Sequence, residues 1–162
     1  MAVRILKIVL VALVGLQGWF YAAGNIVNWD SGIGAVAYVL GMKGHEIYGN
    51  HIFPPITSTA LVTIAFLIII TGEFLVGALS LKGAWDLWRA RGGSADEFNS
   101  SKTFALLGPG MALVVWFGGF IVMGGALFQM WQTQIGSGSF DDAFVFAATS
   151  GLVLLFVNSA DS

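Results

Sequence analysis

The sequence predicts an all-α integral membrane protein, a bundle of four transmembrane helices with almost no soluble part. Of its 162 residues, 57% are hydrophobic and only 10% are charged, whereas soluble domains carry roughly 25% charged residues. Four apolar runs alternate with short polar, glycine-rich segments, and about 20 apolar residues cross a bilayer. No loop reaches the roughly 50 residues of an independent domain. Residues 1–162 are therefore expected to form one membrane domain.

Composition also excludes several classes of function. The net charge of −2 and the absence of a basic run argue against a nucleic-acid partner. The sequence has no cysteine, which excludes disulfides, thiolate metal sites and a cysteine nucleophile. It contains no phosphate-binding P-loop, nucleophile elbow or metalloprotease helix motif. We therefore expect a protein that is not an enzyme.

The first helix is predicted at roughly residues 5–26. Arg4 and Lys7 precede an apolar run that extends to Trp29 without another charge. Such a start is also typical of a signal peptide, but Phe20 and Tyr21 crowd the position where a cleavage site needs small residues. We therefore interpret the run as a transmembrane helix.

Residues 28–55 predict a long first loop that holds both histidines. Within it, residues 33–42 are apolar but too short to span a bilayer. They predict a short helix, capped by Asp30 or Ser31, that lies in the interface or folds over the bundle. Two prolines at 54 and 55 suit the start of the next helix, where a missing N–H costs nothing.

The second helix, predicted at 56–81, holds a single ionisable residue, Glu73. Glu73 lies about eight residues, or ~12 Å, from the Lys82 end of this run. A carboxyl group at that depth is costly, so it usually faces protein or water and marks either a function or a polar contact between helices.

Residues 82–102 predict a polar second loop, and residues 104–130 predict a third helix with Pro109 in its first turns, where proline is least damaging. A polar turn at 132–142 precedes a fourth helix at 143–158. Small residues on the third helix, and polar and aromatic residues at its end, are candidates for contact with partner proteins. These candidates are Gly118, Gly119, Gly124, Gly125, Gln129, Trp131 and Gln132.

The distribution of Lys and Arg predicts the orientation. Two basic residues lie at the N-terminus and four lie in the second loop, whereas the first loop has only Lys43 and the third loop and C-terminal segment have none. The positive-inside rule therefore places the N- and C-termini and the second loop in the cytoplasm and makes the long first loop extracytoplasmic. Tryptophans and arginines at the predicted boundaries are expected to act as interfacial anchors. They are Trp29, Trp85, Trp88, Arg89 and Arg91.

Counting inward from the cytoplasmic ends places four other residues near the depth of Glu73. They are Gln17, Trp116, Thr149 and Ser150. Three interpretations of this intramembrane polar cluster remain open. It fixes the register of the helices through hydrogen bonds, it handles protons or contacts a ligand, or Glu73 meets a polar group on another subunit.

The first loop offers a weak metal-binding pattern. His45, Glu46 and His51 lie close in sequence, with Asp30 upstream, but zinc requires three or four ligands in a fixed shell, and two histidines in a glycine-rich loop are more often solvated. Neither histidine falls in a predicted helix, which disfavours haem. We expect no metal and no cofactor, and leave contact with lipid or quinone open.

Several short runs resemble a known family. They are ITS at 56–58, GEFL at 72–75, GAW at 83–85 with LWR at 87–89, WFGGF at 116–120, FQMWQ at 128–132 and GLVLLF at 151–156. Together the runs resemble a bacterial family of predicted small integral membrane proteins with no assigned function. The resemblance implies a four-helix protein of the bacterial inner membrane that shares the acidic residue of the second helix. Family members often carry a second acidic residue just before the FQMWQ run, where this sequence reads GGAL at 124–127.

The small size, the lack of a catalytic set and the glycine-rich third helix favour one function. We expect a non-catalytic accessory subunit of a larger bacterial inner-membrane complex, with respiratory and photosynthetic complexes as the leading examples. Its expected partners are other membrane subunits and lipids. The alternative is a small oligomeric transporter or channel with Glu73 in the path.

Overall fold

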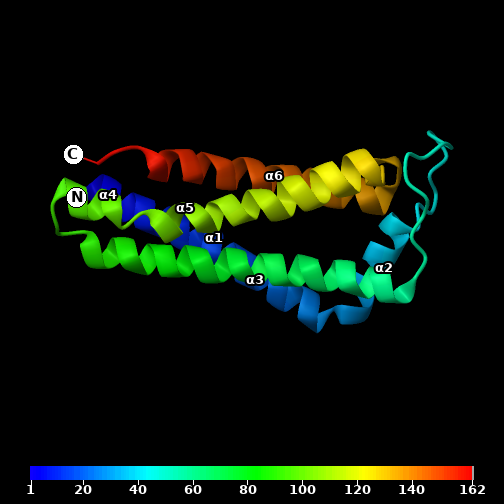
Figure 1. Cartoon of the computed structure of the whole chain (residues 1–162), viewed down its shortest axis with the longest axis horizontal. Helices are drawn as coiled ribbons and strands as arrows, with labels where there is room; N and C mark the ends of the chain where they lie inside the picture. The colour runs from blue at the N-terminus through cyan, green and yellow to red at the C-terminus, as the bar shows by residue number, and fades with distance from the viewer. Residues whose placement is uncertain (162) are drawn as a thin grey trace.

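Four long helices lie side by side in the computed structural model, which describes residues 1–161 (Figure 1). They are α1 (Ala2–Val27), α3 (Thr59–Ala90), a third span made of α5 (Thr103–Ala112) and η1 (Leu113–Leu127), and α6 (Gln134–Asn158). Each of the four is long and apolar enough to cross a membrane. The predicted all-α class with four transmembrane helices is therefore confirmed.

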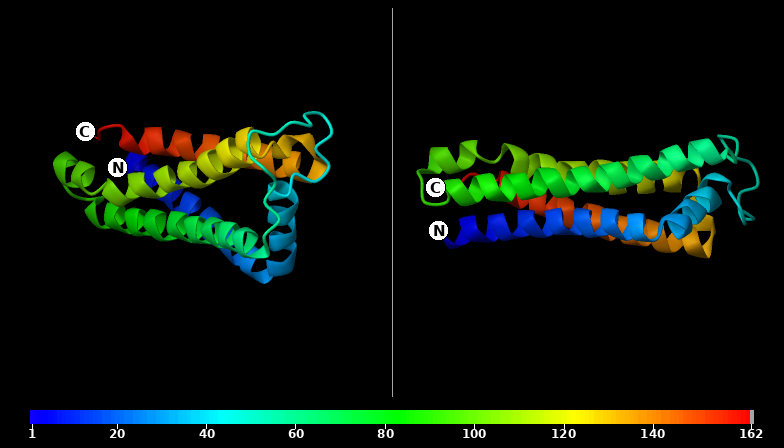
Figure 2. Two further views of the ribbon diagram at one scale, coloured as in Figure 1. Left: turned by 45° about the vertical axis from the view of Figure 1, so that its right-hand side comes forward. Right: turned by 90° about the horizontal axis from the view of Figure 1, so that it is seen from below.

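The two ends of the bundle differ in what they carry. At one end lie both ends of the described chain and the short helix α4 (Ala95–Ser100), and we call it the terminal end (Figures 1 and 2). At the other, the loop end, lie α2 (Trp29–Leu40) and the loop 41–58. The termini and the second loop thus share one end of the bundle, as expected. The prediction that this end is cytoplasmic stays a prediction.

The second span runs well past its predicted end. Residues 82–90, expected to be a loop, are the last turns of α3. Lys82 pairs with Asp86 one turn later at 2.5 Å, and Leu87 is fully buried in a cluster with residues of α1, α4, α5 and α6. Because residues three and four apart share a helix face, this pair and the buried stripe continue the helix beyond the apolar run.

The fourth helix begins nine residues earlier than predicted, at Gln134 rather than 143. The hydroxyl of Thr133 caps it by accepting a hydrogen bond from the Gly136 N–H at 3.1 Å. Asp141 and Asp142 lie exposed within this helix rather than in a turn. The prediction was wrong because it started from the end of the charged residues, although a threonine cap marks a helix start equally well.

The third span changes its winding. Residues 113–127 are π-helical, and the Phe128 N–H donates to the Met123 carbonyl, five residues back, at 2.9 Å. The left-handed backbone of Gln129, with φ of 52°, ends the span and leads into a short 3₁₀ turn, η2 (Met130–Gln132). The wider turn of a π-helix changes which residues share a face, which matters for the glycines described below.

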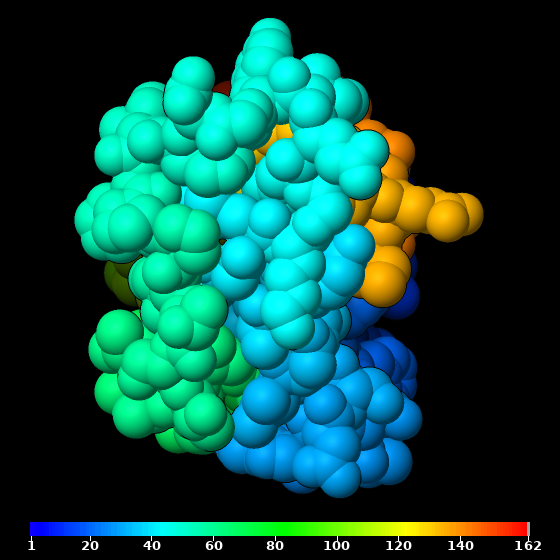
Figure 3. Space-filling view, turned by 90° about the vertical axis from the view of Figure 1, so that its right-hand side faces the viewer, coloured from blue at the N-terminus to red at the C-terminus, as the bar shows by residue number. Residues whose placement is uncertain are grey.

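A short helix does lie in the first loop, as predicted, but its boundaries and cap differ. α2 begins at Trp29, follows Asn28 without a side-chain cap, and places Asp30 in its first turn. The prediction of a cap at Asp30 or Ser31 was therefore wrong. Trp29 packs edge-on against Phe66 of α3, with ring centroids 5.2 Å apart. Together α2 and the loop 41–58 cover the loop end of the bundle (Figure 3).

Glycines set the closest helix contacts in the bundle. A Cβ added to Gly18 of α1 would lie 2.7 Å from the Glu73 carbonyl oxygen and 2.9 Å from the Gly77 nitrogen. A Cβ on Gly83 of α3 would overlap the backbone of Ala105 in α5. Such side-chain-free contacts replace the hydrophobic driving force that helices lack in lipid. Close contact between helix backbones through glycine thus occurs at positions other than those singled out from sequence.

Candidate functional site

The buried carboxyl group of Glu73 lies between α3 and α1. Its side chain is 1% exposed, and the Asn25 Nδ2 donates a hydrogen bond to its Oε2 at 2.8 Å. Within residues 1–161 this is the one hydrogen bond that the carboxyl group makes. Gln17, expected near the depth of Glu73, makes no hydrogen bond to it, and the Gln17 Nε2 is buried without a hydrogen-bond partner in the described chain.

The direction of side chains on a helix explains why Asn25 replaces Gln17. Glu73 lies opposite Gly18 of the antiparallel α1, so a comparison of backbone depth favours residues 17 and 18. Side chains on a helix, however, point toward its N-terminus. The Glu73 side chain therefore points toward the loop end, where Asn25 lies two turns further along α1.

The rest of the predicted polar cluster does not assemble around Glu73. Thr149 is exposed on α6, and its hydroxyl donates to the Val145 carbonyl of its own helix at 2.8 Å. Ser150 is buried with no partner in the described chain. Trp116 is buried among aromatic rings, 5.4 Å from Phe146 and 6.2 Å from Tyr21. The prediction of a single five-residue cluster was therefore wrong, and a carboxyl–amide pair stands in its place.

A cavity of about 500 Å³ lies next to this pair. Its walls come from the ends of α1, α2, α3, η1 and α6 near the loop end, and they are almost wholly apolar. Asn25 is part of the wall and so joins Glu73 to the cavity. The other polar side chain of the lining is Ser139. Nothing in the sequence analysis indicated the cavity, because its walls come from residues far apart in the chain.

The four glycines predicted to meet a partner fall into two pairs. At Gly118 and Gly119 an added Cβ would meet no atom of residues 1–161 within 4 Å; Gly119 lines the cavity described above, whereas Gly118 does not. At Gly124 the Met130 sulfur would lie 2.5 Å from an added Cβ, and Gly125 is covered in the same way by the Phe140 ring. The second pair is therefore occupied by the chain itself.

The polar residues at the end of the third span hold the first loop. The Gln132 Oε1 accepts hydrogen bonds from the Ile47 and Tyr48 N–H groups at 2.9 and 3.0 Å, and the Gln132 Nε2 donates to the Gln129 Oε1 at 2.6 Å. Trp131 packs edge-on against the Tyr48 ring at 5.4 Å. These residues, candidates for contact with a partner, are thus engaged within the chain.

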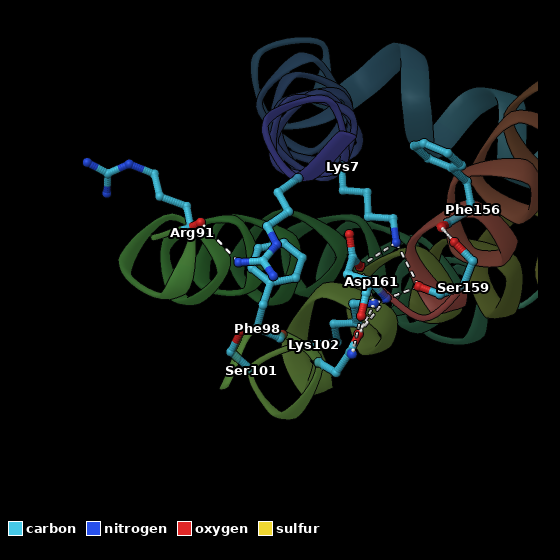
Figure 4. Close-up of polar contacts among 10 residues, drawn as sticks. Lys7, Arg91, Phe98, Ser101, Lys102, Phe156, Ser159 and Asp161 are labelled. Atoms are coloured by element: carbon cyan, nitrogen blue, oxygen red, sulfur yellow. Dashed lines mark hydrogen bonds and ion pairs between the residues drawn. The ribbon is translucent and has the colours of Figure 1, made fainter. Parts of the chain in front are cut away.

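A polar cluster that the sequence analysis missed ties the terminal end together (Figure 4). Lys7 of α1 and Lys102, just before α5, both pair with the Asp161 Oδ2, at 2.6 and 2.7 Å. Both lysines also donate to the Ser159 carbonyl, at 2.7 and 2.6 Å. Burial alone would raise the pKa of Asp161, but the hydrogen bonds from Lys102 and Lys7 outweigh it, so the pKa is lowered.

Four of the five predicted anchors lie near this same end. Trp85 and Trp88 are exposed on the last turns of α3, and the Arg91 guanidinium stacks over the Trp88 ring at 3.8 Å. Arg89 is exposed beside them. Trp29 differs, because its packing against Phe66 makes it part of the contact between α2 and α3.

The two histidines lie together in the loop 41–58. Their ring centroids are 5.8 Å apart. Burial and the neighbouring His51 lower the pKa of His45. Across residues 1–161, no group of three or more His, Cys, Asp or Glu side chains is placed to hold a metal ion. Asp30 and Glu46 therefore do not complete a ligand set with this pair.

Comparison with known proteins agrees with the fold. No curated protein and no solved structure matches the chain. Residues 3–160 match the model of a family described as predicted small integral membrane protein (DUF2165). The four helices of the chain are long and apolar enough to cross a bilayer, which agrees with a multi-pass membrane protein. The family match covers nearly the whole sequence, so the chain belongs to this family.

Proposed function

We propose that the chain is a non-catalytic accessory subunit of a larger assembly in the bacterial inner membrane. The observation that carries this proposal is the open surface of η1 at Gly118, which does not line the cavity and where an added Cβ would meet no atom of residues 1–161 within 4 Å. The exposed Val114 and Phe117 lie on the same helix. In lipid, a helix surface of small residues lets a neighbouring helix approach closely.

The internal polar contacts support a packing role. Glu73 is paired with Asn25, and Asp161 is paired with two lysines. These contacts join segments that are distant in sequence. The polar groups are thus hydrogen-bonded or ion-paired within the chain, and they fix the helices relative to one another. A bundle fixed in this way offers partners a rigid surface.

A second candidate is a small oligomeric transporter or channel with Glu73 in the path. The observation that favours it is the position of Asn25, which both binds the Glu73 carboxyl group and lines the cavity at the loop end. An acidic residue inside a membrane, linked to a cavity, is a common feature of such pathways.

Affinity purification from native membranes in mild detergent, with quantitative mass spectrometry, tests the first proposal. Wild-type chain is expected to carry one set of larger membrane subunits in fixed ratio. Gly118→Leu is expected to lower their recovery at least tenfold, because the new side chain occupies the contact. Gly138→Leu is the matched control, since Gly138 of α6 also has no atom within 4 Å of an added Cβ.

Recovery of the wild-type chain alone, as a monomer or homo-oligomer, contradicts the accessory role. In that event, ion or proton flux in liposomes is measured for wild type and Glu73→Gln. Flux that Glu73→Gln abolishes, in a protein that still folds, supports the second candidate.

A further inference from the structure

The cavity at the loop end has the size and chemistry of a ligand site. Its volume of about 500 Å³ falls in the range of roughly 300–1,000 Å³ that small-molecule sites occupy. Its walls are aliphatic and aromatic, with Asn25 and Ser139 as the polar side chains. From these features we propose that the cavity binds a neutral lipid of the quinone class, with its carbonyl-bearing ring at Asn25 and its isoprenoid tail directed to the bilayer.

Asn25 supplies the polar contact for the head of this ligand. One Nδ2 hydrogen is used by the Glu73 Oε2. The second Nδ2 hydrogen and the Oδ1 make no hydrogen bond within residues 1–161, and the residue is only partly buried. An amide with a free donor on a cavity wall can donate to a carbonyl oxygen, and its free acceptor can receive a hydroxyl hydrogen.

The charge of the lining selects a neutral head. None of the residues that line the cavity is Lys, Arg, His, Asp or Glu, so nothing would neutralise a phosphate or carboxylate. Burying an unpaired charge in an apolar cavity is very costly. Fatty acids and phospholipid heads therefore fit poorly.

Aromatic rings in the lining favour a flat ring over a glyceride. Phe120 contributes a partly exposed ring to the walls, whereas the rings of Phe66 and Phe128 are buried against Trp29 and Phe53. An aromatic face stacks well on a planar conjugated ring. Met123 and Met130 complete this region, and methionine adapts its shape to different ligands. The lining thus combines two polar side chains, Asn25 and Ser139, with one accessible aromatic ring and adaptable apolar side chains.

The tail has a route to the bilayer between α3 and η1. Leu61, Ile64 and Ile68 of α3 line the cavity and are each more than half exposed. Met123 of η1 lines the other side and is 49% exposed. Side chains that are exposed on apolar spans face lipid, so the cavity opens toward the acyl chains rather than toward water.

Tryptophan fluorescence tests the proposal. Purified chain in phosphatidylcholine nanodiscs is titrated with a decyl-substituted benzoquinone, which quenches nearby indole rings. Trp29 packs on Phe66, a wall residue, so we expect saturable quenching that Trp29→Phe largely removes. Ala65 also lines the cavity, and Ala65→Phe is expected to weaken binding at least tenfold. Ala148→Phe is the matched control on the exposed face of α6.

A second variant tests the head contact independently. Asn25→Leu removes the hydrogen bond and is expected to weaken binding about tenfold, the loss typical of one buried hydrogen bond. Thermal unfolding of each variant shows whether it is folded, and if Ala65→Phe is not, Asn25→Leu decides the result.

Three outcomes would overturn the assignment. Quenching that rises without saturation, or is equal in wild type and Asn25→Leu, means partition into lipid rather than binding. Palmitate that competes as well as the quinone contradicts the neutral head. Monoolein that competes equally contradicts the ring. None of these outcomes depends on whether the chain belongs to a larger complex.

Discussion

At the scale of single residues, the pairing of Glu73 with Asn25 is the central feature. The carboxyl group is 1% exposed and has a single amide partner. Hydrogen bonds between helices in a membrane contribute modestly, about 0.6 kcal/mol on average and up to about 1.7. Leaving the carboxyl group without a partner costs more than the bond contributes, because a buried polar group loses water as well.

The difference between the small contribution of the hydrogen bond and the larger cost of an unpaired carboxyl group gives a prediction for two variants. Glu73→Gln keeps an acceptor for the Asn25 amide and is expected to change the free energy of unfolding by less than about 1 kcal/mol. Asn25→Ala leaves the carboxyl group without its partner and is expected to destabilise the protein by about 1–2 kcal/mol. Unfolding in mixed detergent micelles measures both. Thr149→Ala is the control, because its hydroxyl binds only its own helix, and an equal loss in this variant would refute the argument.

The sequence predicted Glu73 as the notable residue but not what it touches. A charged residue in an apolar run is visible from composition alone, and its burial follows from the cost of exposing it to lipid. Its partner depends on the direction in which the side chain points, toward the N-terminus of its own helix. In an antiparallel helix pair this direction shifts the contact from Gln17 to Asn25. The cavity beside it needs five separate segments and has no signature in any one of them.

At the scale of elements, glycine decides how closely the spans pack. The α3 and α5 backbones meet at Gly83, where a Cβ would overlap the Ala105 backbone. A Cβ on Gly108 of α5 would lie 2.6 Å from the Ser80 backbone nitrogen. Both contacts belong to the same helix pair, so the position of the third span depends on the absence of these side chains.

One added methyl group tests this dependence. Gly83→Ala is expected to destabilise the bundle by about 1–3 kcal/mol, because backbone cannot give way as a flexible side chain can. Gly24→Ala is the matched control within a helix, since an added Cβ there meets no atom within 4 Å, and it is expected to be neutral or slightly stabilising. Thermal unfolding in detergent compares them. Equal melting temperatures would show that α3 and α5 do not pack as described.

The helix number could be predicted from sequence, whereas helix ends and faces could not. Hydropathy detects spans because lipid demands apolar residues, but it stops where charges begin, and residues 82–90 and 134–142 are helical with charges in them. The π-helical winding of 113–127 likewise buries Gly124 and Gly125 together with Val115 and Trp116, and leaves Gly119 exposed. A 3.6-residue period does not give this pattern.

At the scale of the whole molecule, different polar contacts hold the two ends of the bundle together. At the loop end, Gln132 holds the first loop through two backbone N–H groups. At the terminal end, the cluster of Lys7, Lys102 and Asp161 joins α1, the start of α5 and the segment after α6. Arg4 adds a hydrogen bond to the Gly93 carbonyl at 2.7 Å. Segments more than 150 residues apart in sequence are fixed to each other in this way.

The ion pairs of Asp161 with Lys7 and Lys102 at the terminal end predict that the stability of the fold depends on pH. The pKa of Asp161 is lower in the folded protein than in the unfolded chain, so its contribution is fully present above the unfolded value of about 3.9. That contribution is lost as pH falls through the folded pKa. Asp161→Asn leaves two buried lysines without their carboxylate and is expected to cost about 1–3 kcal/mol at pH 7.

Melting temperatures of wild type and Asp161→Asn, measured in detergent between pH 7 and pH 3, check this prediction. The difference between them is expected to be large and constant from pH 7 to about pH 5 and to shrink below about pH 4, because protonation of Asp161 makes wild type resemble the variant. Lys82→Met is the matched control, since the Lys82–Asp86 pair is exposed and exposed pairs contribute little. A difference that stays unchanged down to pH 3 would mean that the cluster does not hold the terminal end through the Asp161 charge.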